Sequence, residues 1–93
     1  MKTTRYTSPV LGEVTLATLK MSQRFDITGT SGDNDTLLVA KMLAASVVGK
    51  DGKPLKTVDE WDDYGGENFA DAMAMFSAVM QLNDIKGTAA EKK

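Results

Sequence analysis

The sequence predicts a small α+β domain that is mostly α, with a short N-terminal β-hairpin followed by about four helices, two of them short. Residues 4–19 are rich in Thr and Val and alternate loosely between apolar and polar side chains, as strands do. Residues 35–48 and 67–83 carry apolar side chains at helical spacing, and Gly or Pro residues separate the segments. We expect residues 1–83 to form one domain and residues 84–93 to form a flexible C-terminal tail.

The predicted hairpin needs helices to cover it. Val10, Val14 and Leu16 can share one face of the strands, and Leu11-Gly12 can form the turn between them. Two strands alone are only marginally stable in water, so their apolar face must pack against the helical part of the chain.

Short polar residues set the expected starts of the first two helices. Ser22 can cap a short helix that ends at Gly29, because its hydroxyl can accept a hydrogen bond from a free amide in the first turn. Asp33 or Asp35 can cap the second helix in the same way. This second helix, over residues 35–48, is apolar around most of its circumference, which predicts a central position in the fold.

A capping box predicts the start of the third helix. Thr57 is followed three residues later by Glu60, so each side chain can bond the backbone amide of the other residue. Gly65-Gly66 should end this short helix, as Gly49 should end the second one in the C′ position. The last helix is expected over residues 67–83.

Large apolar side chains form a stripe along the last predicted helix, at spacings of i, i+4, i+7 and i+11. Such a stripe is more often a core face than a contact surface, but Met and aromatic side chains also suit the recognition of a partner helix. The single Trp either packs on neighbouring helices or lies partly exposed at a binding surface. The candidate partner-binding residues are therefore Trp61, Tyr64, Phe69, Met73, Phe76 and Met80.

The composition removes most catalytic and metal-binding chemistry. The chain has neither Cys nor His, which excludes disulfides, Ser–His–Asp and Cys–His nucleophilic systems, and ordinary zinc sites. The loop GTSGDND lacks the Gly-Lys-Ser/Thr of a phosphate-binding loop, and the acidic residues do not have the spacing of an EF-hand. We therefore predict no enzyme activity, no catalytic residues, no cofactor and no metal site.

Charge is distributed unevenly along the chain. The formal net charge of −2 argues against general nucleic-acid binding. Residues 57–85 contain seven acidic side chains and no basic one, so they form either a solvated acidic face or a surface for a basic partner or a second copy. A small core without disulfides also favours self-association, and we expect a homo-oligomer. No stretch approaches the ~20 apolar residues of a membrane span, so we expect no membrane partner and a cytosolic location.

The order of motifs resembles one known family. A strand ends in Val14-Thr15-Leu16, residues 19–21 lead into a helix, and the apolar helix TLLVAKMLAASVV follows. DGKPL at residues 51–55 then precedes a short helix, and the last helix ends near Leu82-Asn83. Over about residues 10–83, this layout is similar to that of the small tail assembly chaperones of long-tailed bacteriophages.

The resemblance implies a non-enzymatic assembly factor that acts in the host cell cytoplasm. Members of that family coat the long, apolar, helical tape-measure protein, keep it soluble, and help to recruit tail-tube subunits. Two other functions stay open. One is an acidic regulatory or inhibitor module that binds a basic partner through residues 57–71, and the other is a permanent structural subunit of the virion tail.

Overall fold

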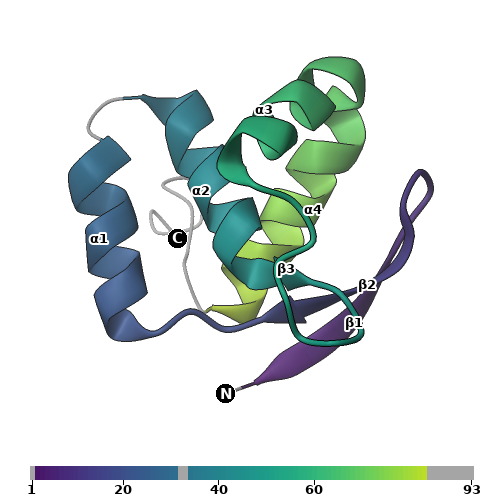
Figure 1. Ribbon diagram of the computed structural model, residues 1–93, viewed down its shortest axis with the longest axis horizontal. Coiled ribbons are helices and arrows are strands. Elements are labelled where there is room, and N and C mark those ends of the chain that lie inside the picture. The colour runs from purple at the N-terminus through teal and green to yellow at the C-terminus, as the bar shows by residue number, and fades with distance from the viewer. Residues whose placement is uncertain (1, 32–33, 84–93) are drawn as a thin grey trace, which may run out of the picture.

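The computed structural model describes residues 2–31 and 34–83. In this part of the chain, four helices lie on one side of a three-stranded antiparallel sheet, and two of them pack directly against it (Figure 1). The sheet has the order β1-β2-β3 and consists of β1 (Thr3–Ser8), β2 (Gly12–Ala17) and β3 (Val47–Val48). The helices are α1 (Met21–Ser31), α2 (Asp35–Ser46), α3 (Val58–Glu67) and α4 (Phe69–Leu82). The predicted α+β class, with its N-terminal hairpin, is confirmed.

The hairpin presents one apolar face to the helices. β1 and β2 pair antiparallel, with Ser8 opposite Gly12 at the turn. Val14 and Leu16 are buried beneath the helices, whereas Val10 lies in the turn and is exposed, so the prediction that it shares their face is wrong. Gly12 has a φ of 81°, a left-handed conformation that glycine adopts without strain.

Helix α1 is longer than predicted. It contains both Ser22 and Gly29, so the first does not cap the helix and the second does not end it. At the start of the helix, the Lys20 amide instead donates a hydrogen bond of 2.7 Å to the side chain of Gln23. The helix continues through Gly29 because an internal glycine costs only about 1 kcal/mol relative to alanine, while Ile27 in the preceding turn packs in the core.

Helix α2 starts at a cap other than the two predicted ones. The side-chain oxygen of Asn34 accepts a hydrogen bond of 2.9 Å from the Leu37 amide, so Asn34 is the N-cap. Asp35 is the first helical residue, where its negative charge is favourable next to the positive end of the helix dipole. Asp33, the other predicted cap, and the predicted tail over residues 84–93 lie outside the described residues.

Helix α2 ends earlier than predicted because Val47 and Val48 form the third strand. They pair antiparallel with β2, and β-branched side chains favour such an extended backbone. Val47 is the C-cap residue of the helix, and its backbone is already extended, with φ −90° and ψ 116°. The helix over residues 35–48 is therefore wrong at its end, and Gly49 is not its C′ residue.

The predicted capping box is confirmed at the start of α3. The Thr57 hydroxyl accepts a hydrogen bond of 3.1 Å from the Glu60 amide, and the Glu60 carboxylate accepts one of 2.8 Å from the Thr57 amide. Gly65-Gly66 does not end this helix as predicted, because tertiary packing of α3 outweighs the weak helix propensity of glycine. Only Asn68 separates the two last helices, and α4 begins two residues later than predicted.

The core lies between the sheet and the helices. It consists of Val14, Leu16, Leu19, Ile27, Ala40, Met42, Leu43, Val47, Trp61, Tyr64, Ala72, Met75 and Val79. The contribution of α4 to this core comes from a face different from the predicted stripe of large apolar residues.

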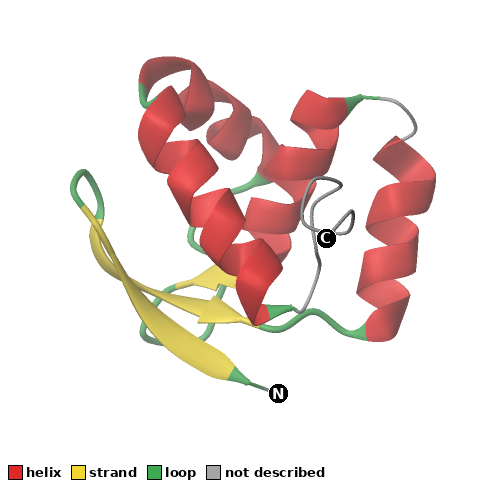
Figure 2. Cartoon of the chain, turned by 180° about the vertical axis from the view of Figure 1, so that it is seen from behind, coloured by secondary structure: helices red, strands yellow, loops and turns green. Residues whose placement is uncertain are grey.

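Polar contacts fix α4 against the hairpin near both of its ends. The Ser8 hydroxyl donates a hydrogen bond of 2.6 Å to the Asp71 carboxylate, in the first turn of α4. At the other end, the side-chain oxygen of Asn83 accepts a hydrogen bond of 2.6 Å from the Leu19 amide, just after β2. In Figure 2, α4 accordingly runs down to meet the sheet.

Candidate functional site

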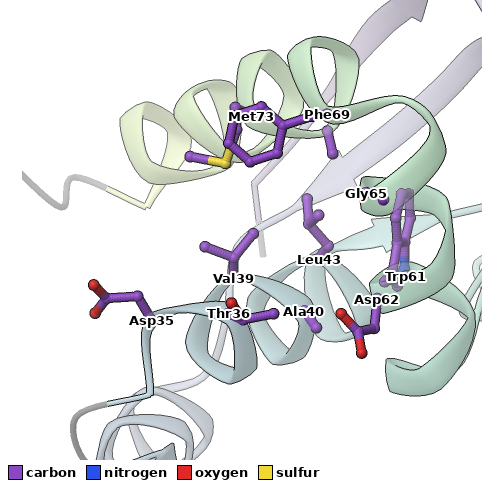
Figure 3. Close-up of a pocket in the computed structure, with 12 residues that line it drawn as sticks. Asp35, Thr36, Val39, Ala40, Leu43, Trp61, Asp62, Gly65, Phe69 and Met73 are labelled. Carbon is purple, nitrogen blue, oxygen red and sulfur yellow. The ribbon is translucent and has the colours of Figure 1, made fainter.

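A groove between α2, α3 and α4 is the candidate site. Its volume is about 420 Å³, within the ~300–1,000 Å³ that is usual for ligand sites. The residues that line it are Asp35, Thr36, Val39, Ala40, Leu43, Trp61, Asp62, Gly65, Gly66, Phe69, Ala72 and Met73 (Figure 3). Most of these are apolar or small, so the groove suits an apolar ligand.

The base of the groove belongs to the core, whereas one rim is exposed. Leu43 and Ala72 are buried at the base. On α4, Phe69 is 70% exposed and Met73 is 36% exposed, although both are large apolar side chains. Figure 3 shows them facing α2 across the groove, toward Val39 and Leu43. An exposed apolar rim above a buried apolar base is typical of a surface that a partner covers.

Carboxylates flank the apolar surface. Asp35 at the start of α2 and Asp62 on α3 both line the groove and are exposed. Figure 3 shows them at opposite ends of it. The groove therefore combines an apolar interior with negative charge at its two ends.

Trp61 forms part of the groove wall but is a core residue. Its side chain is 1% exposed and contacts Tyr64 edge-on, with 5.4 Å between the ring centroids and an interplanar angle of 88°. Such a T-shaped contact is favourable for aromatic rings. The Lys56 ammonium lies 5.9 Å from the Trp61 ring centroid and 5.3 Å from that of Tyr64, within cation–π range. Among the described residues, the buried indole N–H of Trp61 finds no hydrogen-bond acceptor.

A buried polar cluster lies behind these aromatic rings. One carboxylate oxygen of Asp71 accepts hydrogen bonds from the Tyr64 hydroxyl and from the Ser8 hydroxyl. The Ser8 oxygen in turn accepts hydrogen bonds from the Val10 and Leu11 amides, at 3.1 and 2.9 Å. The cluster thus joins the hairpin turn, α3 and α4 below the groove, and its role is to hold these elements in place.

The Tyr64 hydroxyl makes the stability sensitive to alkaline pH. Burial, and then the hydrogen bond to Asp71, raise the pKa of Tyr64 above its ordinary value of 10.0. Because the folded pKa is the higher one, this contribution to stability is complete below about pH 10 and is lost as the pH rises through the folded pKa. In urea unfolding between pH 8 and pH 11, Tyr64→Phe should lose less stability with rising pH than the wild type. Tyr6→Phe is the control, and an alkaline slope reduced equally by both variants would contradict the assignment.

The structure separates the predicted partner-binding residues into three groups. Trp61 and Tyr64 are buried in the core, and Phe69 and Met73 form the exposed rim of the groove. Phe76 and Met80 are half-buried and do not line the groove. The four large residues of the predicted stripe are thus not the fully buried face of α4, because Ala72, Met75 and Val79 occupy that position.

The residues that α2 and the two glycines of α3 contribute to the groove are not among the predicted partner-binding residues. Asp35, Thr36 and Val39 come from α2. The available signal was the apolar character of α2 around most of its circumference, because such a helix needs cover on more than one side. The glycine pair predicts a helix end by its local propensity, whereas it lies within a continuous helix that forms one wall of the groove.

A second exposed apolar pair lies on α1, away from the groove. Met21 is 74% exposed and Phe25 is 71% exposed, and they are four residues apart on one side of the helix. They match the residue types of the groove rim without lining it, which makes them a suitable control surface.

Two further properties concern only residues 2–31 and 34–83. No three acidic side chains come together in an arrangement that could hold a metal ion. None of the helices combines the length and the apolar character that crossing a membrane requires.

Comparison of the chain with protein families, curated proteins and solved structures gives no match.

Proposed function

We propose that this chain is a non-enzymatic tail assembly chaperone that binds an apolar helix of a phage tape-measure protein in the groove between α2, α3 and α4. The observation that carries the proposal is the exposed rim of Phe69 and Met73 above a buried apolar base. In this function the chaperone acts in the host cell cytoplasm, keeps the tape-measure protein soluble and helps to recruit tail-tube subunits.

The shape of the groove favours a helix over a small molecule. Its long sides are helices, α2 and α4, and α3 closes it where Trp61 lies (Figure 3). Its exposed rim lies beside open solvent, so a small ligand would leave much of Phe69 uncovered. An amphipathic helix laid between two helices can cover both the base and the rim with side chains spaced at i, i+3 and i+4.

The side chains available to the groove support binding rather than catalysis. Among the described residues that line the groove, polar side-chain atoms belong only to Asp35, Asp62, Thr36 and the Trp61 indole. The carboxylates stand at opposite ends of the groove (Figure 3), whereas an acid–base pair must act on the same reacting group. Asp71 does not line the groove: one of its carboxylate oxygens accepts hydrogen bonds from the Ser8 and Tyr64 hydroxyls, and the other is buried without a partner among the described residues.

Co-expression with the tape-measure protein encoded beside it tests the function. We expect the wild-type chain to keep that protein in the soluble fraction and to copurify with it. The double variant Phe69→Ser/Met73→Ser should reduce the copurified amount at least tenfold, because burying each large apolar side chain contributes about 1.5–3 kcal/mol.

The matched control is Met21→Ser/Phe25→Ser, which removes the same residue types from α1. This control should bind like the wild type. If both double variants lose the partner equally, nonspecific hydrophobic association explains the binding. If the wild-type chain forms no complex and the tape-measure protein stays insoluble, the proposed function is wrong.

A further inference from the structure

The charge of the groove has one sign. Twelve of the described residues line it, and among these only Asp35 and Asp62 are charged; they stand at its opposite ends (Figure 3). Carboxylates at the edge of an apolar surface attract cations on a partner and repel anions, so they affect which partner binds more than how tightly the apolar part binds.

Two glycines leave the α3 side of the groove without side chains. Gly65 and Gly66 lie inside α3, and neither has a positive φ that would require glycine. Outside its chain neighbours and the adjacent backbone of its own helix, a Cβ added at Gly66 would meet no atom within 4 Å, and one added at Gly65 would make only an ordinary contact of 3.8 Å with Ala72. The fold therefore does not need glycine at these positions, and glycine even makes the helix less stable than alanine would. What the glycines provide is room at the wall of the groove.

We infer that the groove selects an apolar helix that carries Lys or Arg beside its apolar face, and that Asp35, Asp62 and Gly66 determine this specificity. The apolar side chains of the partner helix cover Leu43 and the rim, while its cations reach the carboxylates at the two ends. Its backbone passes close to α3 at Gly66, where no side chain intervenes. The inference rests on the proposed function, because it assigns a partner chemistry to the same groove.

Two synthetic helical peptides test the charge selection. They share a Leu- and Ala-rich apolar face, differ only in carrying Lys or Glu beside it, and contain no Trp, so the fluorescence of Trp61 reports binding. At low salt we expect the Lys peptide to bind at least tenfold more tightly than the Glu peptide. The difference should narrow at high salt, because ions screen exposed charges. Equal affinities would overturn the charge selection and leave the proposed function intact, whereas failure of both peptides and of the tape-measure protein would overturn both.

Matched charge variants locate the selection. Asp35→Asn/Asp62→Asn should weaken the Lys peptide about three- to tenfold, as expected for two exposed ion pairs, and leave the Glu peptide no weaker. Asp59→Asn/Asp63→Asn removes the same net charge from exposed positions of α3 outside the groove, and it should change the affinity less than twofold. An equal loss in both variants would mean that the whole acidic face attracts cations, and would overturn the inference.

The variant Gly66→Ala should have opposite effects on partner binding and on the stability of the fold. Because an alanine fits sterically in the free protein, the folding equilibrium constant should rise about fivefold, the usual gain for glycine to alanine inside a helix. Binding of the Lys peptide should nevertheless fall at least threefold, since the new methyl group occupies the space of the partner backbone. Unchanged or tighter binding would overturn the role of Gly66.

Discussion

Replacing Trp61 with alanine is expected to lower the free energy of unfolding by about 3–5 kcal/mol, the range for large aromatic residues removed from a core. The indole is almost completely buried and packs against both Tyr64 and the groove base. A domain of this size has a total stability of only about 5–15 kcal/mol. Urea unfolding followed by far-UV circular dichroism measures the loss, since the variant has no other Trp for fluorescence.

Trp61→Phe is the matched control. It keeps an aromatic ring in the core and removes the indole N–H that lacks an acceptor among the described residues. Relief of that unpaired donor offsets part of the lost packing, so the variant should lose less than half as much stability as Trp61→Ala. If both variants lose the same free energy of unfolding, a smaller aromatic ring does not replace the packing of the indole, and the expected gain from removing its N–H is contradicted. Trp61→Ala is accordingly a poor probe of binding, because it changes the fold and the groove together.

The second large effect is expected for Asp71→Ala, with a loss of about 2–4 kcal/mol. The substitution removes the shared acceptor of two buried hydroxyls, and each buried donor left without a partner costs about 1–3 kcal/mol. Those hydroxyls belong to Ser8 and Tyr64, which lie on the hairpin and on α3. Chemical unfolding at neutral pH gives the stability of the variant.

Two comparisons identify the cause of that loss. Asp71→Asn keeps the shape and one acceptor oxygen, so it should retain most of the stability that Asp71→Ala loses. Asp63→Ala removes an exposed carboxylate from α3 and should change stability by no more than about 0.5 kcal/mol, as is usual for surface positions. A loss in Asp71→Ala no greater than that of Asp63→Ala would show that the buried cluster contributes little.

Features that depend on neighbouring residues could be predicted from the sequence. The capping box of Thr57 and Glu60 needs only residues three apart, and the alternation of residues 4–19 was sufficient for the hairpin. The helix ends were harder, because glycine has a modest local cost that tertiary packing can exceed. Both Gly29 and Gly65-Gly66 lie inside helices for this reason.

The face that α4 buries could not be predicted because it depends on distant partners. Its sequence is apolar on several sides. By periodicity alone, the core face could therefore be the one that carries Phe69 and Phe76 or the one that carries Ala72 and Val79. Contact with Ser8 orients Asp71 inward and brings Ala72 with it, which leaves Phe69 outside. The same orientation creates the groove rim, so the candidate site depended on a contact that no local pattern displays.

The contacts of α4 with the hairpin also determine when the fold can be completed during synthesis. The hydrogen bonds from Ser8 to Asp71 and from Leu19 to Asn83 span 63 and 64 residues of sequence. A two-stranded hairpin is marginal by itself, and such distant contacts are slow to form because long loops must close first. A nascent chain on the ribosome therefore cannot secure its first-made strands until residue 83 has emerged. We expect the protein to fold after most of it has been translated, as one cooperative step.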